Sequence, residues 1–216
     1  IASLENISVE GIFTHFADSD GDGEQFTRWQ YKMFTSLLSE LEARNINVGI
    51  RHCCNSAGIV NYPEYQMDMV RMGIGLYGIG IDKNSPIRPV ATLKTRILQI
   101  KELTEEDTVG YNRKGKLNKP SRIAAIPIGY ADGLSRAFGN GNGYVMINGK
   151  KAPFVGNICM DVCMIDVTDI DCREGDIVEI FGDNLPITVL SDALNTIPYE
   201  VLTTISNRVK RVYFQG

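Results

Sequence analysis

Two histidines lie near the ends of short apolar runs that are typical of buried strands. His15 belongs to residues 9–16, and His52 belongs to residues 50–54. In a β/α barrel the carboxyl ends of the strands face the active site, where an imidazole can hold or transfer a proton. A lone histidine is more often structural, so each indicates a site only in company with other residues.

Three further features could bind an anion. Asn55 and Ser56 open a predicted short helix, whose first backbone amides together with the Ser56 hydroxyl suit a phosphate oxygen. Arg71 lies on a predicted strand, where a buried charge needs a partner, and Gly73 and Gly75 would let an anion approach the backbone. A helix cap, an exposed arginine and space-filling glycines explain each feature equally well when it is taken alone.

Three segments in the second half run from a strand edge into a turn that carries Gly, Asn or Asp. They are residues 109–113, 127–133 and 156–161, which contain Tyr111, Tyr130 and Met160 respectively. Taken singly, each is best explained as a turn with a packed tyrosine or methionine. Cys159 and Cys163 are four apart but have no His or Cys cluster nearby, so we expect no metal site.

The elements that must position the first group alternate between strand and helix. Strands are predicted at residues 9–16, 50–54 and 69–77. A helix is predicted after Asp22, which could cap it with Gln25 as its capping-box partner. Its apolar residues recur at helical spacing: Phe26, Trp29, Met33, Phe34, Leu37, Leu38 and Leu41. This order implies parallel strands, and three strands are too few to close a barrel, so they would belong to a larger one.

The pattern changes at residues 82–89, which hold two prolines and few apolar residues and mark the predicted domain boundary. Beyond it the expected strands are residues 92–103, 122–128, 144–147, 163–167 and 176–181. Asn148-Gly149 predicts a hairpin turn, and residues 188–196 and 199–207 favour helices. The predicted fold class is therefore α/β followed by a β-rich domain.

Composition excludes several classes of partner. The net charge of −4 comes from interspersed charges, and no basic block of the kind a nucleic-acid partner needs is present. No apolar run approaches membrane-spanning length, so we expect neither a nucleic acid nor a membrane as partner. The five cysteines are odd in number, which favours reduced thiols and a cytoplasmic location.

Taken in order, these segments resemble the alanine racemase family, which is pyridoxal phosphate (PLP)-dependent and of fold-type III. The resemblance covers nearly the whole chain. It is carried by three strings: Arg71-x-Gly-Ile-x-Leu-Tyr-Gly78, Ile126-Pro-Ile-Gly-Tyr-Ala-Asp-Gly133 and Asn157-Ile-Cys-Met-Asp161. It implies that residues 1–82 are the last strands and helices of a (β/α)8 barrel and that residues 90–216 are the carboxyl-terminal β domain. Family members are head-to-tail homodimers with shared active sites.

The resemblance also implies roles for single residues. Tyr111 would be the catalytic tyrosine that exchanges the α-proton of alanine, with His15 beside it. Arg71 would contact the pyridine nitrogen of PLP, and His52 would hold Arg71 in place. The phosphate would be bound by Ser56, the amides of Gly73 and Ile74, and Tyr199. Tyr130 and Met160 would line the substrate entrance and the carboxylate site. The expected activity is interconversion of L- and D-alanine, which supplies D-alanine for peptidoglycan.

Two departures from the family pattern stand out. The family's Schiff-base lysine and a supporting arginine belong to an early segment that this chain does not contain. The chain therefore resembles a fragment, and we expect the fragment alone to be inactive. Arg208-Val-Lys-Arg211 replaces the frequent Arg-Val-Pro-Arg, which should change only a turn. Alternatives are a serine racemase of the same family, against which Tyr199 argues, and a non-catalytic domain that binds PLP or a partner.

Overall fold

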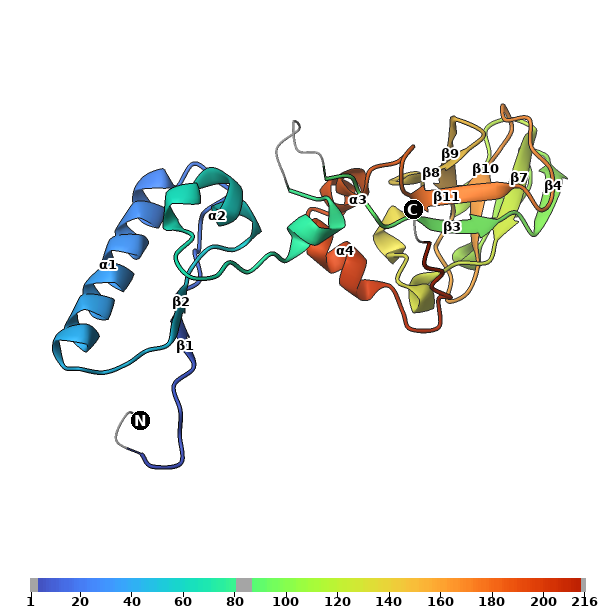
Figure 1. Ribbon diagram of the computed structural model, residues 1–216. Helices are drawn as coiled ribbons and strands as arrows, with labels where there is room; N and C mark the ends of the chain where they lie inside the picture. Colours follow the sequence, from blue (N-terminus) through green and yellow to red (C-terminus); the bar gives the residue numbers. More distant parts are fainter. Residues whose placement is uncertain (1–3, 81–86, 215–216) are drawn as a thin grey trace. The chain divides into compact units, whose positions relative to one another are not determined.

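The computed structural model describes residues 4–80 and 87–214. The chain forms two compact units, Ile1–Val90 (unit 1) and Ala91–Gly216 (unit 2). Most of the predicted boundary segment, residues 82–89, falls outside the described residues. Each unit is described separately below (Figure 1).

Unit 1 is built on two parallel strands joined by a long helix. β1 (Gly11–Phe13) pairs with β2 (Ile50–His52), and α1 (Glu24–Ala43) connects them. α2 (Ser56–Asn61) follows β2, and 3-10 helices occupy Pro63–Tyr65 and Ile74–Tyr77. The predicted strand–helix–strand order is confirmed for these first elements. The predicted strand at residues 69–77 is wrong. Only one parallel bridge, His52 to Met69, forms there, because the chain then turns into a 3-10 helix.

The start of α1 also differs from the prediction. The residue before the helix is Gly23, and no side chain caps it. Asp22 is therefore not the cap, and the capping box with Gln25 does not form. The Asp18 carboxylate lies against this turn, where a Cβ on Gly23 would come within 1.8 Å of it.

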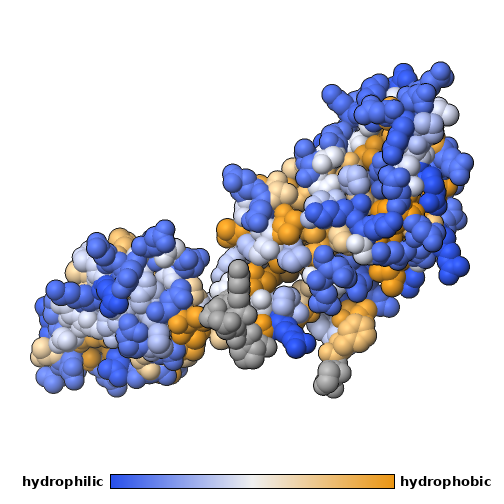
Figure 2. All heavy atoms as spheres, turned by 90° about the horizontal axis from the view of Figure 1, so that it is seen from above, coloured by the Kyte–Doolittle hydropathy of each residue, from blue (hydrophilic) through white to orange (hydrophobic). Residues whose placement is uncertain are grey.

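The apolar residues of α1 divide between two faces. Phe34 packs in the unit 1 core with Phe16, Cys53 and Cys54, and Leu38 packs against that core. A second row remains exposed: Phe26, Trp29, Met33 and Leu37. The helical period predicted from the sequence is confirmed, and these apolar residues divide between a buried face and an exposed one. Figure 2 shows apolar surface on both units.

Unit 2 contains a seven-stranded antiparallel sheet in the order β3-β11-β8-β9-β10-β7-β4. The strands are β3 (Leu93–Arg96), β4 (Gln99–Leu103), β7 (Ser121–Ile126), β8 (Tyr144–Ile147), β9 (Lys150–Val155), β10 (Cys163–Asp166) and β11 (Ile177–Phe181). The single strand predicted over residues 92–103 is broken at Ile97 and Leu98. The Ile97 amide donates to Asp176 near β11, and the Leu98 amide donates to Ala125 in β7. Because consecutive strands thus stand at the two ends of the order, the sheet curls on itself (Figure 1).

Smaller elements complete unit 2. β5 (Thr108–Val109) and β6 (Gly115–Lys116) form a short hairpin, and the Asn148-Gly149 turn between β8 and β9 is confirmed. The two predicted helices are present as α3 (Ile187–Ala193) and α4 (Pro198–Thr204). Ile126, Val145 and Ile165 lie in the core of the sheet, and each is at most 1 % exposed.

Candidate functional site

Arg71 is the centre of a polar cluster in unit 1. Its Nη1 lies 2.6 Å from Nδ1 of His52, and its Nη2 lies 3.2 Å from Nδ1 of His15. Nη2 also donates to the carbonyl oxygens of Thr14 and Cys53, at 3.0 and 3.2 Å. The structure therefore brings together the three residues that the sequence predicts as one group, and it holds the guanidinium from two strand ends.

These contacts fix the protonation of the histidines. A guanidinium only donates hydrogen bonds and stays protonated, so Nδ1 of His52 and of His15 must accept. Each imidazole then carries its proton on Nε2. Burial and the nearby Arg71 charge lower the pKa of His52, which favours the same neutral form.

The Arg71 charge has no carboxylate partner among residues 4–80 and 87–214; its acceptors are two neutral rings and two carbonyl oxygens. These acceptors leave Nε–H and one Nη1–H unused. A half-buried cation with unused donors is suited to an acceptor atom of a ligand.

Phe13 supports this cluster and was not singled out in the sequence. Its ring stacks on His52 at 5.2 Å between centroids, and the guanidinium carbon of Arg71 lies 4.9 Å from its centre. A cation over an aromatic face is attracted to it. The side chain is 60 % exposed despite being an apolar residue on a strand. Its place two residues before His15 is the only sequence signal that could have indicated it.

Ser56 joins the start of α2 to residues 73–75, here called the glycine loop. Its Oγ accepts hydrogen bonds from the amides of Gly73 and Gly75, at 2.9 and 3.1 Å. A hydroxyl has two acceptor positions and one donor, so both acceptor positions are filled and the proton remains to be donated. A Cβ on Gly73 would meet only the Ser56 oxygen, at 3.7 Å, so the loop surface is open. A buried hydroxyl that must donate, beside an open loop, fits a phosphate oxygen.

Two neighbours of Ser56 are structural. Asn55 caps α2, because its Oδ1 accepts from the Gly58 amide at 2.9 Å and from the Ser19 hydroxyl at 2.7 Å. Cys53 is fully buried, burial raises its pKa to about 12, and its thiol donates to the Tyr65 carbonyl oxygen. A protonated, enclosed thiol is not a nucleophile, so Cys53 serves as a packing residue.

In unit 2, Tyr111 stands on a strained turn between β5 and β6. Gly110, Asn112 and Arg113 around it all have φ between 52° and 74°, in the left-handed region. Asn157 Nδ2 donates to the Tyr111 carbonyl oxygen at 3.2 Å, and Asn140 in turn donates to Asn157. The Tyr111 side chain is 73 % exposed. The turn therefore presents the phenol outward while the backbone is held rigidly.

Tyr130 and Met160 are brought together by their backbones. The Tyr130 amide donates to the Cys159 carbonyl oxygen at 3.0 Å, and the Ala131 amide donates to that of Met160 at 3.1 Å. A Cβ on Gly129 would come within 2.3 Å of both carbonyl oxygens, so only glycine allows this approach. Both side chains remain exposed.

Tyr199 lies in α4, and its side chain is 48 % exposed. Among the residues that the structure describes, no hydrogen bond joins it or the Tyr111 hydroxyl to another predicted site residue. Within the same part of the chain, no group of three His, Cys, Asp or Glu residues is suited to a metal. No described helix is long and apolar enough to cross a membrane. All five cysteines are free thiols.

The chain matches two domains of one family. The sequence profile described as "Alanine racemase, N-terminal domain" matches residues 1–80, and the profile "Alanine racemase, C-terminal domain" matches residues 90–213. The alanine racemase of Methanococcus maripaludis is 42% identical over 223 aligned residues, which cover 99% of this chain and 59% of that protein.

Solved structures agree. The alanine racemase of Clostridium difficile 630 superposes with a TM-score of 0.89 at 37% identity, over 98% of this chain and 57% of that one. The Bartonella henselae alanine racemase, described with covalently bound pyridoxal phosphate, gives 0.86 at 33% identity, over 95% and 56% of the two chains. The chain thus spans less than two thirds of the length of these relatives. From both profiles and these similarities, the chain belongs to the alanine racemase family.

Proposed function

We propose that this chain is the carboxyl-terminal part of an alanine racemase and that it provides one portion of a PLP-dependent active site. The observation that carries the proposal is the Arg71 cluster, in which two neutral histidines and two carbonyl oxygens hold a cation that has no carboxylate partner among the described residues. When bound, PLP withdraws electrons from the α-carbon of an amino acid and so acidifies its proton.

Unit 1 corresponds in this proposal to the last strands of a (β/α)8 barrel, and unit 2 to the β domain. The exposed apolar row on α1 supports this assignment, because Phe26, Trp29 and Met33 are each about half exposed. Apolar faces of this kind are normally covered by neighbouring barrel elements. The curled sheet of unit 2 is the counterpart of the β domain in the solved racemases.

Arg71 would donate from Nε to the pyridine nitrogen. Its Nη2 and one Nη1–H are occupied by His52, His15 and backbone oxygens, so Nε–H and the second Nη1–H are the donors left for a ligand, and Nε–H is the one proposed here. A guanidinium does not give up its proton, and the ring nitrogen therefore stays unprotonated. Arg71 thus limits how strongly electrons are withdrawn, which disfavours side reactions such as transamination.

The phosphate would lie at Ser56 and the glycine loop. Ser56 would donate its remaining proton, and the amides of Gly73 and Ile74 would line the same position. The Gly73 amide already donates to Ser56, so Ser56 also sets the orientation of the loop. Tyr199 would add a further phenol donor from α4.

Tyr111 would take and return the α-proton on one face of alanine. A phenol of ordinary pKa near 10 needs help to act as a base, and His15, with Nε2 carrying its proton, would stand beside it. Tyr130 and Met160 would line the approach to the substrate carboxylate. We further propose the homodimer of the family, in which Tyr111 acts in the partner's site, and a cytoplasmic enzyme that supplies D-alanine for peptidoglycan.

The second base and the covalent anchor would be a lysine outside this chain. Racemisation needs one base on each face of the α-carbon, and none of the lysines in this sequence lies in the family's context. The chain alone is therefore proposed to be inactive on alanine.

The test is an assay of the full-length protein on alanine and on serine, with the upstream lysine intact or replaced. The proposal expects alanine turnover that exceeds serine turnover and is lost without the lysine. Preferred turnover of serine would instead support the serine racemase alternative. Absence of any upstream lysine would support a non-catalytic domain.

A further inference from the structure

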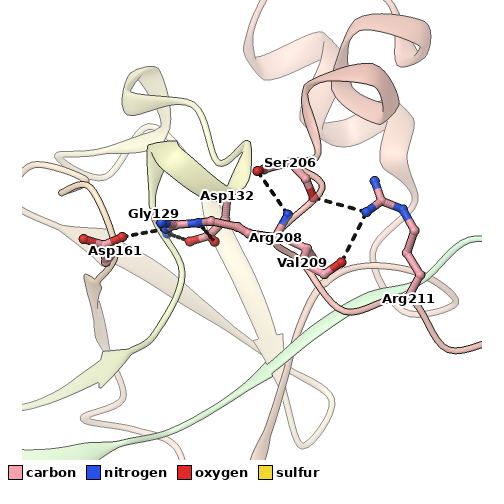
Figure 3. A network of polar contacts seen from close by, with 7 residues as sticks. All are labelled: Gly129, Asp132, Asp161, Ser206, Arg208, Val209 and Arg211. Atoms are coloured by element: carbon pink, nitrogen blue, oxygen red, sulfur yellow. Dashed lines mark hydrogen bonds and ion pairs between the residues drawn. The ribbon is translucent and has the colours of Figure 1, made fainter.

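We infer that Arg208 is a positioning residue that fixes Tyr130 against Met160. The inference rests on the proposed function, in which these two side chains line the substrate side of the site. It starts from a motif for which the sequence suggested only a change of turn, Arg208-Val-Lys-Arg211. In the structure both of its arginines are engaged (Figure 3).

One guanidinium joins two carboxylates from separate loops. Arg208 Nε donates to Oδ1 of Asp132 at 2.7 Å, and Nη2 donates to Oδ1 of Asp161 at 2.6 Å. Asp132 follows Tyr130 by two residues, and Asp161 directly follows Met160. The same cation therefore holds both substrate-side segments through their nearest carboxylates (Figure 3).

Asp132 also anchors the turn that presents Tyr130. Its Oδ2 accepts from the Gly129 amide at 2.9 Å, while Oδ1 faces Arg208. The Asp132 side chain is only 14 % exposed, whereas that of Asp161 is 59 % exposed. Solvent screens the second pair more strongly, so the Asp132 contact is the stronger of the two.

Without Arg208 the two loops would carry facing negative charges. The loops touch through the Tyr130 and Ala131 amides, which donate to Cys159 and Met160. Repulsion between Asp132 and Asp161 would weaken these two hydrogen bonds first. Lengthening either hydrogen bond would move Tyr130 away from Met160.

The tail after α4 sets the place of Arg208. The Ser206 amide donates to the Asp132 carbonyl oxygen at 3.1 Å. Arg211 donates to the carbonyl oxygens of Ser206 and Val209 (Figure 3). It also donates to that of Ile205, and these contacts close the turn. Because α4 also carries Tyr199, the network connects three of the predicted ligand-contacting side chains within unit 2.

The two contacts with Asp132 and Asp161 require an arginine at position 208. Nε and Nη2 of a guanidinium are separate donors held at a fixed spacing in one plane, and here each reaches a different carboxylate, whereas a lysine is a single point charge on a flexible stem. Arg208→Lys should keep the charge and lose one of the two contacts.

The first test measures amide hydrogen exchange of this chain by NMR in Arg208→Gln and Arg208→Lys. Exchange of the Tyr130 and Ala131 amides is expected to accelerate about tenfold in Arg208→Gln and less in Arg208→Lys, with the β7 amides unchanged. Arg173→Gln, which removes another arginine–aspartate pair of unit 2, is the matched control and should leave both amides as they were.

Unchanged exchange of both amides in a folded Arg208→Gln protein would overturn the inference. If that variant does not fold, Arg208→Lys carries the test, and wild-type exchange in it would overturn the inference in the same way.

The second test uses the full-length protein. Arg208→Lys should raise KM for alanine about tenfold with little change in kcat, because the displaced residues meet the substrate and not its proton. A fall in kcat at constant KM would mark a merely structural role and contradict the inference. If the unsubstituted protein does not racemise alanine, the proposed function fails, while the exchange result on Tyr130 and Ala131 still decides the role of Arg208 in positioning.

Discussion

Nη1 of Arg71 lies 2.6 Å from Nδ1 of His52, and this contact determines which imidazole nitrogen carries the proton. Arginine cannot accept, so His52 must accept at Nδ1 and remain neutral while the contact lasts. Phe13 stacks on the same imidazole and lies against the same guanidinium. The three side chains contact one another, so a substitution of any one changes the surroundings of the other two.

Arg71→Gln should raise the pKa of His52 towards its ordinary value. Burial lowers this pKa most and the Arg71 charge lowers it further, so removing the charge leaves only the burial effect. NMR titration of the His52 ring protons measures the change. The chain has only two histidines, so the ring signals of His52 need to be distinguished only from those of His15. An unchanged or lower pKa of His52 in the variant would contradict the assignment.

The same shift predicts how the stability of unit 1 depends on pH. The folded state holds the pKa of His52 below the ordinary histidine value of about 6.5, so the unfolded chain binds the proton more readily. The free energy of unfolding should therefore be level above about pH 6.5 and fall as the pH drops from there towards the folded pKa of His52. Arg71→Gln should flatten this dependence, which urea unfolding at several pH values would measure.

Ser56→Ala should destabilise unit 1 by about 1–3 kcal/mol, because the amides of Gly73 and Gly75 lose their common acceptor. The only tryptophan, Trp29, lies in α1, so its fluorescence reports the unfolding of unit 1. The control is Ser135→Ala, which removes a serine cap in unit 2 and should leave the Trp29 transition in place. Equal transitions for Ser56→Ala and the wild type would show that the loop does not depend on this hydroxyl.

Gly129→Ala should destabilise unit 2 by about 1–3 kcal/mol, because the new methyl group would meet two carbonyl oxygens at 2.3 Å and force the Tyr130 turn away. Gly141→Ala is a suitable comparison: Gly141 has φ of 83° but no atom within 4 Å of its Cβ position, so only backbone strain of about 1 kcal/mol applies there. Thermal unfolding followed by circular dichroism measures both. A smaller loss for Gly129→Ala than for Gly141→Ala would contradict the close approach.

Local sequence patterns predicted the fold where neighbouring residues determine it. The period of α1 and the Asn148-Gly149 turn depend on residues close in sequence, and both are confirmed. β9 was missed because it begins with two lysines and contains Pro153, which opposes a strand. The strand expected at residues 69–77 failed because its glycines adopt non-extended backbone angles, such as φ −102° and ψ −103° at Gly73.

Site residues could be predicted from the sequence where they lie near the end of a predicted strand. His15 and His52 lie together because the ends of β1 and β2 meet at one edge of a sheet, and the chain after the Met69 bridge brings Arg71 to them. Arg208 could not be assigned a role in this way, since its partners are 76 and 47 residues distant in sequence and meet it only through the folded tail. Phe13 was missed because an apolar residue on a strand is usually explained by packing alone.

Tyr111→Phe should separate chemistry from folding. The Tyr111 hydroxyl has no hydrogen-bond partner among the described residues, so the unfolding of this chain should be unchanged. Racemisation by the full-length protein should fall by about 100- to 10,000-fold, because the proton acceptor on one face is lost. Near-wild-type racemisation by Tyr111→Phe would remove Tyr111 from the proposed mechanism.

The most direct measurement is racemisation by the purified 216-residue chain itself. The chain is incubated with PLP and L-alanine, and D-alanine is determined by a stereospecific oxidase, with the full-length protein as the positive control. We predict no D-alanine above the blank from the chain and clear formation by the full-length protein, because the proposed lysine base is not among these residues. D-alanine formed by the chain alone, and lost on Tyr111→Phe, would contradict it.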